Sequence, residues 1–354
     1  MSATEKPVSP GTVPGRYSRQ VLFGPLGESG QRKLMHSRVA IVGMGALGTV
    51  LANHMVRAGI GYLRLIDRDF VEESNLQRQM LYEEADAAAS RPKAAAAAER
   101  LGRINSLVEI EPHVTDLNPS NAEELLTGVD LVLDGSDNFA VRFLINDVCV
   151  KHGIPWIYGG AVSARGVMMT ILPGATPCFR CLFQQPPDQG AMETCDTAGV
   201  LGPIIHVVAS CQAAEALKLL SGNREALNKG MLHFDLWHNF QGGMDMSGAR
   251  REECPCCGQG QFDYLTAELE GETLQSLCGR NAVQIVPVRP RQLDLEELEL
   301  ALRRSGSTER NAFLLKYRAD NGLTLVLFPD GRAMVQGTAD LAAAKSFYSR
   351  YVGM

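Results

Sequence analysis

The 354-residue sequence predicts an α/β fold, in which a doubly wound, mainly parallel sheet is followed by a small α+β domain. Two observations support this prediction. From residue 38 to about residue 160, short apolar segments suited to strands alternate with segments of helical spacing, as in parallel sheets covered by helices. The first strand and helix of this series are joined by a glycine-rich turn, GMGALG, at residues 43–48.

The elements are expected in the following order. Apolar runs predict strands at 38–42, 62–66, 108–112, 130–133, 156–158, 167–172 and 231–236. Apolar residues at helical spacing, such as Leu47, Leu51 and Met55, predict helices at 45–58, 92–104, from about 138, and 203–220. Ser90-Arg91-Pro92 predicts an N-cap with proline in the first turn of the second of these helices.

The character of the chain changes after the ECPCCGQG segment. Beyond it we expect a helix at 293–304, a hairpin at 312–335 that turns at Pro329-Asp330-Gly331, and a last helix at 338–351. The chain is therefore expected to comprise a flexible tail (1–15), a main domain (16–261) and a small α+β domain of unknown role (262–354).

Composition excludes several classes of protein. With 45% hydrophobic residues the chain can fill a real core, and its net charge of −6 disfavours a nucleic-acid partner. The Pro-, Ser- and Gly-rich start does not resemble a signal peptide, and no apolar run is expected to approach the length of a membrane span. Nine cysteines, an odd number with several in pairs, favour a reducing cytoplasm over a disulfide framework.

The glycine-rich turn predicts a nucleotide site. Gly43, Gly45 and Gly48 form a Gly-x-Gly-x-x-Gly pattern between strand and helix, and Asp67 lies 19 residues beyond Gly48 (67 − 48). In Rossmann-like folds the glycines permit close approach of phosphates to the helix N-terminus, and the acid binds ribose hydroxyls. Dehydrogenases share this pattern, so it indicates the class of ligand but not the reaction.

The residues that follow favour a triphosphate over a nicotinamide cofactor. Asn75, Arg78 and Gln79 lie close after the ribose acid, and Lys93 lies in the first turn of a helix. Transfer of a phosphoryl or nucleotidyl group needs such cations and polar donors near the developing negative charge. The helix dipole disfavours a cation at the position of Lys93 unless an anion binds there, although a solvated lysine at a helix start is also common.

An acidic segment, DGSDN, follows the fourth predicted strand. Ligands bind at the carboxyl ends of strands in such sheets, and carboxylates are suitable ligands for Mg²⁺. Asp134 or Asp137 is therefore a candidate for holding Mg²⁺ on the phosphates. The alternative for Asp137 is a helix N-cap.

The cysteines form two pairs with the same spacing. Two residues separate Cys178 from Cys181, and two separate Cys254 from Cys257. The second pair begins 73 residues after the end of the first (254 − 181). Two such pairs predict a closed tetrahedral Zn²⁺ site, whereas one pair alone is also compatible with a redox dithiol. Cys256 is the spare thiol and is not expected to be a ligand.

Cys195 lies just before an apolar helix in METCDTAGVLGP. A cysteine near a helix N-terminus has a lowered pKa and is a candidate nucleophile, although a loop cysteine without chemistry is the alternative. Cys149, Cys211 and Cys278 are expected to be ordinary small apolar residues.

The ordered motifs closely resemble those of the family of ThiF, MoeB and the ubiquitin-activating enzymes. These motifs are RYSRQ, GMGALG, D-x-D-x-V-x-x-S-N-L-x-R-Q, the lysine of SRPKA, and DGSDNFAVR, and they span about residues 16–260. The resemblance implies ATP- and Mg²⁺-dependent adenylation of the C-terminal glycine carboxylate of a ubiquitin-like sulfur-carrier protein that ends in Gly-Gly. It also implies a sulfur donor, such as a cysteine desulfurase, and a homodimer.

The resemblance assigns roles to residues. It implies that Asp67 binds ribose, that Asn75, Arg78 and Lys93 serve the phosphates, and that Asp137 is the acid linked to Mg²⁺. Asp69 and Gln79 belong to the same nucleotide-binding motif, and Ala46 replaces a glycine that is usual in the loop. Arg19 matches an arginine that reaches the partner subunit's site, Cys195 matches an acceptor of acyl groups or sulfur, and the four paired cysteines match the zinc ligands.

Three rival functions remain open at this stage. An NAD-dependent oxidoreductase on the same fold is disfavoured by Arg78, Lys93 and Asp137, and a non-catalytic partner subunit is disfavoured because all the nucleotide residues are kept. A tRNA-modifying relative is disfavoured by the low positive charge and the zinc pairs. The carrier's pathway (thiamin, molybdopterin or another thiolation route) is not specified, and partner docking is one hypothesis for the C-terminal domain.

Overall fold

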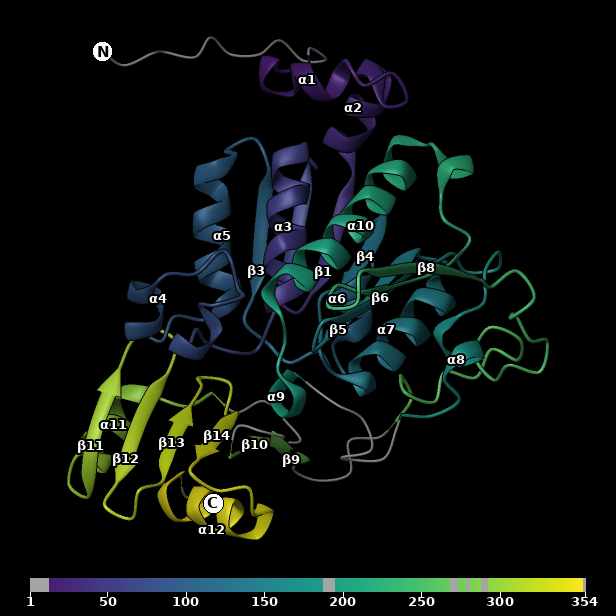
Figure 1. Ribbon diagram of the computed structural model, residues 1–354. Helices are drawn as coiled ribbons and strands as arrows, with labels where there is room; N and C mark the ends of the chain where they lie inside the picture. Colours follow the sequence, from purple (N-terminus) through teal and green to yellow (C-terminus); the bar gives the residue numbers. More distant parts are fainter. Residues whose placement is uncertain (1–12, 187–194, 268–272, 278–280, 288–291, 353–354) are drawn as a thin grey trace, which may run out of the picture. The chain divides into compact units, whose positions relative to one another are not determined.

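The computed structural model describes residues 13–186, 195–267, 273–277, 281–287 and 292–352 (Figure 1). The chain divides into two compact units. The first comprises Met1–Pro187 and Val200–Thr266, and the second comprises Asp188–Gly199 and Ala267–Met354. Most of the expected tail, residues 1–12, lies outside the described residues.

The first unit is built on an eight-stranded sheet with the order β3-β2-β1-β4-β5-β6-β7-β8. The five neighbouring strands β3, β2, β1, β4 and β5 run parallel to one another. Strands β6, β7 and β8 continue the sheet, and each is antiparallel to the strand before it. The predicted doubly wound, mainly parallel sheet is confirmed. The strands are β1 (Arg38–Val42), β2 (Tyr62–Ile66), β3 (Glu109–His113), β4 (Leu131–Asp134), β5 (Trp156–Val162), β6 (Arg165–Ile171), β7 (Gly230–Asp235) and β8 (Phe240–Asp245).

Helices cover both faces of this sheet. The helices of the first unit are α1 (Ser18–Val21), α2 (Gly27–His36), α3 (Ala46–Ala58), α4 (Glu84–Ala88), α5 (Lys93–Ile104), α6 (Ala122–Leu126), α7 (Phe139–His152), α8 (Phe179–Leu182) and α10 (Gly202–Ser221). Short 3-10 helices are η1 (Gly15–Tyr17), η2 (Glu73–Asn75) and η3 (Arg224–Ala226). Figure 1 shows α5, α3 and α10 side by side over one face.

The alternation of side chains along β1 explains why there are two cores. Val39 and Ile41 are buried with residues of α3, α5 and α10, whereas Ala40 and Val42 are buried on the opposite face with residues of α6 and α7. Because successive side chains of a strand point to opposite faces, a strand covered on both sides must be apolar throughout. The strand order reverses between β1 and β4, so their carboxyl ends form the point where ligands bind in such sheets.

Helix α10 is long and apolar enough to cross a membrane by length and composition. The expectation that no apolar run reaches that length is therefore wrong. However, 56% of its apolar window is buried within the structure, and the helix packs on α3, β5 and β6. Burial of this kind is typical of the core helix of an α/β domain.

Local features of the first unit also differ from the sequence prediction. Helix α2 and the edge strand β8 were not expected; β8 contains two glycines and is mostly exposed, so it carries little apolar pattern. Helix α5 begins at Lys93 with Pro92 as its N-cap and no side-chain cap. Ser90 instead has a φ of 47°, so the predicted serine cap is wrong.

The second unit contains a six-stranded antiparallel sheet with the order β11-β12-β13-β14-β10-β9. Its core joins Val283 and Val335 of the sheet to Leu302 and Phe347 of the two longer helices. The elements are α9 (Cys195–Ala198), β9 (Thr273–Leu277), β10 (Ala282–Val286), α11 (Leu295–Leu302), β11 (Gly306–Arg310), β12 (Leu315–Ala319), β13 (Thr324–Leu327), β14 (Ala333–Gln336) and α12 (Leu341–Val352).

The expected single hairpin at 312–335 is in fact three strands joined by two turns. The turn at Pro329-Asp330-Gly331 is present, with Gly331 at a φ of 87°. A second turn, closed by a hydrogen bond from Gly322 N to Ala319 O (3.1 Å), separates β12 from β13. Its sequence, Asp320-Asn321-Gly322, carries the turn chemistry that sequence reasoning overlooked.

Candidate nucleotide site and metal centre

The glycine-rich loop packs directly against the loop after β4. Gly43 has a φ of 87°, and a Cβ on Gly43 would lie 2.8 Å from the carbonyl of Gly135. A Cβ on Gly135 would lie 2.7 Å from Gly43 O and 2.8 Å from the Cα of Gly48. The backbones at the ends of β1 and β4 therefore touch, and only glycine fits at these three positions.

The N-terminus of α3 presents free backbone N–H groups at this edge of the sheet. Its N-cap is Gly45, which has no side chain to occupy those donors, and Ala46 is the first helical residue. Uncapped donors and the positive end of the helix dipole favour a bound phosphate. The glycine loop predicted from the sequence is thus placed where a phosphate can bind.

Asp67 is held against the glycine loop at the end of β2. Its Oδ2 accepts a hydrogen bond from Met44 N and its Oδ1 accepts one from Asp69 N, both at 2.6 Å. Burial raises the pKa of Asp67, while the charge of Lys93 opposes this shift. The two hydrogen bonds hold the predicted ribose acid beside the loop in a fixed orientation. Each carboxylate oxygen keeps a further acceptor position for a ligand.

Lys93 is buried beside Asp69 at the start of α5. Its Nζ donates to Asp69 Oδ2 (3.2 Å), its backbone N donates to Asp69 O (2.8 Å), and the residue is only 2% exposed. The hydroxyl of Tyr82 donates to Met44 O (2.7 Å) and Lys93 O (3.2 Å). The structure thus brings Asp67, Asp69 and Lys93 together around the glycine loop.

Asn75, Arg78 and Gln79 lie on and just after η2. Asn75 Oδ1 accepts from Glu72 N (3.2 Å), which fixes the turn. Gln79 is buried, its Oε1 has no hydrogen-bond partner among the described residues, and its Nε2 would lie 3.9 Å from a Cβ on Gly45. An orphaned amide atom beside the glycine loop indicates room for a polar ligand group.

Arg78 is a partly exposed cation of this segment. Its Nη1 donates to Ser74 O (2.9 Å), and it lines a hollow of about 310 Å³ together with Pro203 and His206 from the start of α10. The side chain is therefore anchored at one nitrogen and has other N–H groups left to bind an anion.

The acid that ends β4 and the acid of the loop after it differ in their availability for a metal ion. Asp134 is fully buried: its Oδ2 pairs with Arg142 (2.9 Å) and its Oδ1 accepts from Ser136 N (2.9 Å) and Oγ (2.6 Å). Asp137 is exposed, and among the described residues nothing hydrogen-bonds its carboxylate. The N-cap of α7 is Asn138, whose Oδ1 accepts from Ala140 N (2.8 Å), so the N-cap alternative for Asp137 is wrong.

Sequence reasoning missed two buried residues that shape this edge of the sheet. Arg142 on α7 bonds Asp134, Ser136 O and Gly159 O. Gln212 on α10 donates to Asp134 O (3.0 Å) and Ile157 O (3.1 Å) from the opposite face. Arg142 ends the DGSDNFAVR motif, one helical turn after the cap, and that spacing was a usable signal; nothing in the local sequence marks Gln212.

Arg19 does not lie near the nucleotide residues of its own chain. It is exposed on α1, next to Tyr17, whose ring lies against Gly59 at the carboxyl end of α3. The glycine loop is at the other end of α3, and 13 residues of helix span about 20 Å. Cys195 begins α9 in the second unit, and its side chain lies outside the described residues.

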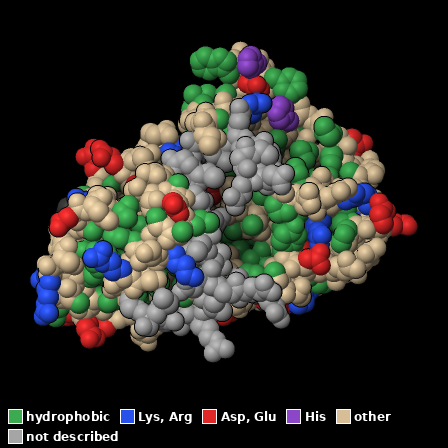
Figure 2. Space-filling view, turned by 90° about the horizontal axis from the view of Figure 1, so that it is seen from below, with side chains coloured by type: hydrophobic (Ala, Val, Ile, Leu, Met, Phe, Trp, Pro, Cys, Tyr) green, Lys and Arg blue, Asp and Glu red, His purple; other side chains and the backbone are tan. Residues whose placement is uncertain are grey.

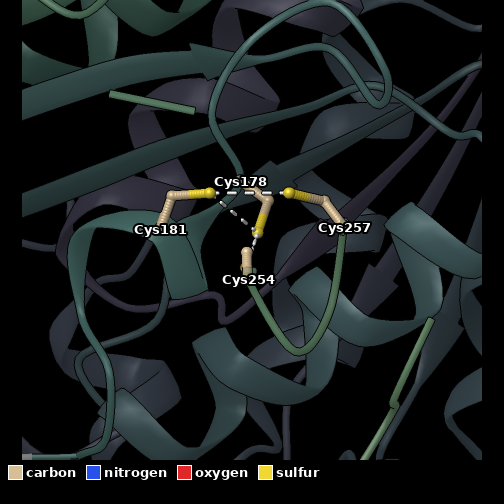
Figure 3. Close-up of side chains that lie close together, drawn as sticks. All are labelled: Cys178, Cys181, Cys254 and Cys257. Carbon is tan, nitrogen blue, oxygen red and sulfur yellow. Dashed lines mark hydrogen bonds between the residues drawn. The ribbon is translucent and has the colours of Figure 1, made fainter. Parts of the chain in front are cut away.

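The four paired cysteines converge on one point (Figure 3). Their sulfur atoms all lie within 4.8 Å of one another, with Sγ–Sγ distances of 3.9 Å for Cys178–Cys181, 3.6 Å for Cys178–Cys254 and 3.5 Å for Cys181–Cys257. A tetrahedron of thiolates 2.3 Å from a metal has edges of about 3.8 Å. The donor set therefore fits a tetrahedral metal ion that joins α8 and its N-cap to the chain after β8.

Cys256 is buried beside this cluster but points to α7. Its Sγ accepts a hydrogen bond from Asn146 Nδ2 (3.2 Å), while Asn146 Oδ1 accepts from Phe179 N (2.8 Å). Asp147 Oδ2 accepts from Tyr264 N (2.9 Å). The fifth thiol thus anchors the cysteine loops to α7 and, as expected, is not one of the four convergent sulfurs.

Charge is mixed on the face of the protein shown in Figure 2. On the face in Figure 2, acidic and basic side chains are interspersed, and the described residues form no continuous basic patch there. This distribution agrees with the net charge of −6.

The fold and the site define an α/β nucleotide-binding protein with a second centre made of four thiols. Residues 17–256 match the model of the ThiF family. The chain belongs to the ThiF family.

Relatives and solved structures agree with this assignment. The chain is 45% identical to the sulfur carrier protein ThiS adenylyltransferase of Bacillus subtilis over 96% of this chain and 99% of that protein. It is 39% identical to the SAMP-activating enzyme E1 of Haloferax volcanii, over 71% of this chain and 91% of that protein. The crystal structure of E. coli MccB with ATP covers 70% of this chain and 77% of its own at a TM-score of 0.61 and 23% identity, which indicates a shared fold.

Proposed function

We propose that this ThiF-family adenylyltransferase activates the C-terminal glycine carboxylate of a ubiquitin-like sulfur-carrier protein with ATP. The observation that carries the proposal is the convergence of the glycine loop, Asp67, Lys93 and the exposed Asp137 at one edge of the sheet. The Bacillus subtilis relative, named a ThiS adenylyltransferase, supports it because the similarity extends over 96% of the chain.

The reaction transfers AMP to the carrier. A carboxylate oxygen of the terminal glycine attacks the α-phosphorus of ATP, the bond to the bridging oxygen breaks, and pyrophosphate leaves. The N–H groups at the start of α3 lie free to hold phosphate oxygens, and Asp67 accepts from ribose hydroxyls. Lys93, Arg78 and the amide of Asn75 are assigned to the negative charge that grows toward pyrophosphate.

Magnesium is assigned to Asp137 rather than to Asp134. Asp137 offers an unshared carboxylate, whereas the oxygens of Asp134 are taken by Arg142 and Ser136. Carboxylate oxygen is the kind of donor that Mg²⁺ prefers. When bound, the ion neutralises phosphate charge in the transition state.

Zinc is assigned to Cys178, Cys181, Cys254 and Cys257. The distances between their sulfur atoms suit four thiolates around one ion, and such closed sites are structural. The hydrogen bond with Cys178 and burial raise the pKa of Cys181 to about 12, so the thiol of Cys181 holds a proton that a metal ion would displace on binding.

Sulfur transfer follows adenylation. The acyl-adenylate is attacked at its carbonyl by a sulfur nucleophile, and AMP leaves. We assign the relay to Cys195, whose thiolate attacks the acyl-adenylate and forms a thioester with the carrier as AMP leaves. Sulfide released by a donor such as a cysteine desulfurase then attacks the thioester carbonyl, the Cys195 thiolate leaves, and the carrier ends in a thiocarboxylate. The carrier is assigned to thiamin, molybdopterin or a related thiolation route.

The protein is proposed to act as a homodimer in the cytoplasm. Arg19 lies at the far end of α3 from the glycine loop of its own chain, so it reaches a nucleotide only across a subunit interface. The seven cysteines whose side chains the structure describes are all free thiols, which is in keeping with a reducing compartment.

The proposal is tested by incubating the protein with ATP and a ubiquitin-like carrier that ends in Gly-Gly. Intact-mass analysis is expected to show the carrier gaining one AMP, and the gain is expected to vanish when the last glycine is removed. A carrier that never gains AMP, in a preparation that binds NAD instead, would identify the oxidoreductase alternative as correct.

A further inference from the structure

We propose that Arg142 is a positioning residue for adenylation, which fixes the direction of the Asp137 carboxylate without touching the nucleotide. This inference rests on the proposed function, because it assigns to Arg142 an effect on the acid that holds Mg²⁺. It concerns a residue of the DGSDNFAVR motif to which neither the motif nor the comparisons give a role.

Arg142 is buried and uses its guanidinium on three acceptors. Its Nε donates to Asp134 Oδ2 (2.9 Å), and its Nη2 donates to Ser136 O (2.7 Å) and Gly159 O (3.1 Å). The rings of Phe139 and Tyr158 lie 5.3 Å and 5.1 Å from the guanidinium carbon. The side chain therefore links α7, the end of β4 and the middle of β5 in one fixed geometry.

The loop that Arg142 holds is the one that carries Asp137. Asp134 Oδ1 accepts from both Ser136 N and Ser136 Oγ, and Arg142 binds the carbonyl of Ser136 from the other side. Asn138 is fixed as the N-cap of α7. Asp137 is thus the single residue between two anchored neighbours, so its backbone has little freedom while its carboxylate stays exposed.

The opposite face of the sheet has a matching restraint. Gln212 on α10 donates to Asp134 O and Ile157 O, which bridges β4 and β5 at the point where their pairing ends, at Leu133 and Ile157. A Cβ on Gly159 would lie 2.4 Å from the amide of Gln212, so this glycine makes the bridge possible. The end of β4 is therefore clamped from α7 and from α10 at once.

The chemistry of the clamp requires arginine. A planar guanidinium offers donors in a fixed fork, whereas a lysine ammonium is a point charge on a flexible stem. Lysine at position 142 would keep a positive charge beside Asp134 but would not hold Ser136 O and Gly159 O in the same geometry. Arg142→Lys therefore loosens the loop, while the lysine charge still neutralises the buried carboxylate of Asp134.

The test compares Arg142→Lys with Arg64→Lys. Arg64 is a matched control, because it also donates to backbone carbonyls (Leu125 O and Thr127 O) and pairs with an acid, but it lies within β2, away from the loop after β4. Both full-length variants are measured for thermal stability, zinc content, carrier-dependent ATP–pyrophosphate exchange and the Mg²⁺ concentration that half-saturates exchange. Nucleotide-dependent Mn²⁺ binding is measured by electron paramagnetic resonance.

Arg142→Lys is expected to lower exchange by roughly 100-fold, as displacement of about 1 Å at a reacting centre does. It is also expected to raise the half-saturating Mg²⁺ concentration and weaken Mn²⁺ binding to the ATP complex, whereas Arg64→Lys leaves both metal constants unchanged. In an Asp137→Asn background, Arg142→Lys is expected to add less than about a threefold loss, because residues that act through one another are not additive.

Metal constants for Arg142→Lys that equal those of Arg64→Lys would overturn the proposal, as would losses that multiply in the double variant. If Arg142→Lys does not fold, Gln212→Met, which removes the restraint from the other face, must weaken Mn²⁺ binding in the same direction. The Mn²⁺ measurement also distinguishes failure of the proposed function from failure of the positioning role of Arg142. A wild-type protein that binds Mn²⁺ with ATP but exchanges with no carrier refutes the proposed function and still tests Arg142.

Discussion

Gly48→Ala perturbs the glycine loop directly, and its effect follows from one distance. A Cβ on residue 48 would lie 1.8 Å from Gly43 O and 2.8 Å from Gly43 C. Because a comfortable C···O contact is about 3.3 Å, the gap must open by about 1.5 Å. The obstructing atoms are backbone, and Gly135 packs against the same loop, so the loop itself has to move.

We expect Gly48→Ala to lower the free energy of unfolding by about 2–3 kcal/mol, as overpacking does, and to lower exchange by roughly 100-fold through displaced phosphate donors. Urea unfolding and carrier-dependent ATP–pyrophosphate exchange measure the two effects. Gly102→Ala on α5 is the control, because nothing lies within 4 Å of the added methyl group, and a helical alanine there is expected to stabilise by about 0.4–1 kcal/mol. Wild-type stability and exchange in Gly48→Ala would refute the close-contact reasoning.

Three further outcomes are expected. Metal analysis should find about one zinc per chain, as a four-thiolate site implies. Cys178→Ser should lose the metal and unfold more readily, and full zinc occupancy in this variant would contradict the assignment. Asp137→Ala should lose about 3–4 kcal/mol of transition-state stabilisation, several hundredfold in exchange, while Cys195→Ala should exchange normally and fail only in sulfur transfer; normal sulfur transfer would make Cys195 structural. Mixing Arg19→Ala with Asp137→Ala chains should restore activity, because each mixed dimer has one intact site; no recovery in dimers shown to exchange subunits argues against action across the interface.

The parts of the site that could be predicted from sequence are those set by local geometry. A glycine loop between strand and helix, and an acid at the end of the next strand, are placed by short segments whose conformation depends on neighbours in the chain. Asp67 and the glycine loop are therefore found together as expected. The two cysteine pairs were also recognisable, because a spacing of two residues already suits metal binding.

The parts that could not be predicted depend on contacts between distant segments. Gln212 reaches the end of β4 across 78 residues of sequence, and only the packing of α10 on the sheet brings it there. Residue chemistry alone left Asp134 and Asp137 as alternative candidates, and only the family resemblance favoured Asp137. The physical difference between them is the ion pair of Asp134 with Arg142, and although the spacing of Arg142 in the motif was a signal, the pairing itself is seen only in the folded chain. Ser90 was mistaken for a cap because its backbone conformation is set by the turn before α5.

Carrier-dependent ATP–pyrophosphate exchange tests the central claim most directly. Labelled pyrophosphate is incubated with the protein, ATP, Mg²⁺ and a ubiquitin-like carrier that ends in Gly-Gly, and the same carrier without its last glycine is run in parallel. We predict that label enters ATP only with the intact carrier, because the attacking carboxylate has to reach the α-phosphate at the end of β1. Label that enters ATP equally with the shortened carrier, or with none, would contradict the account.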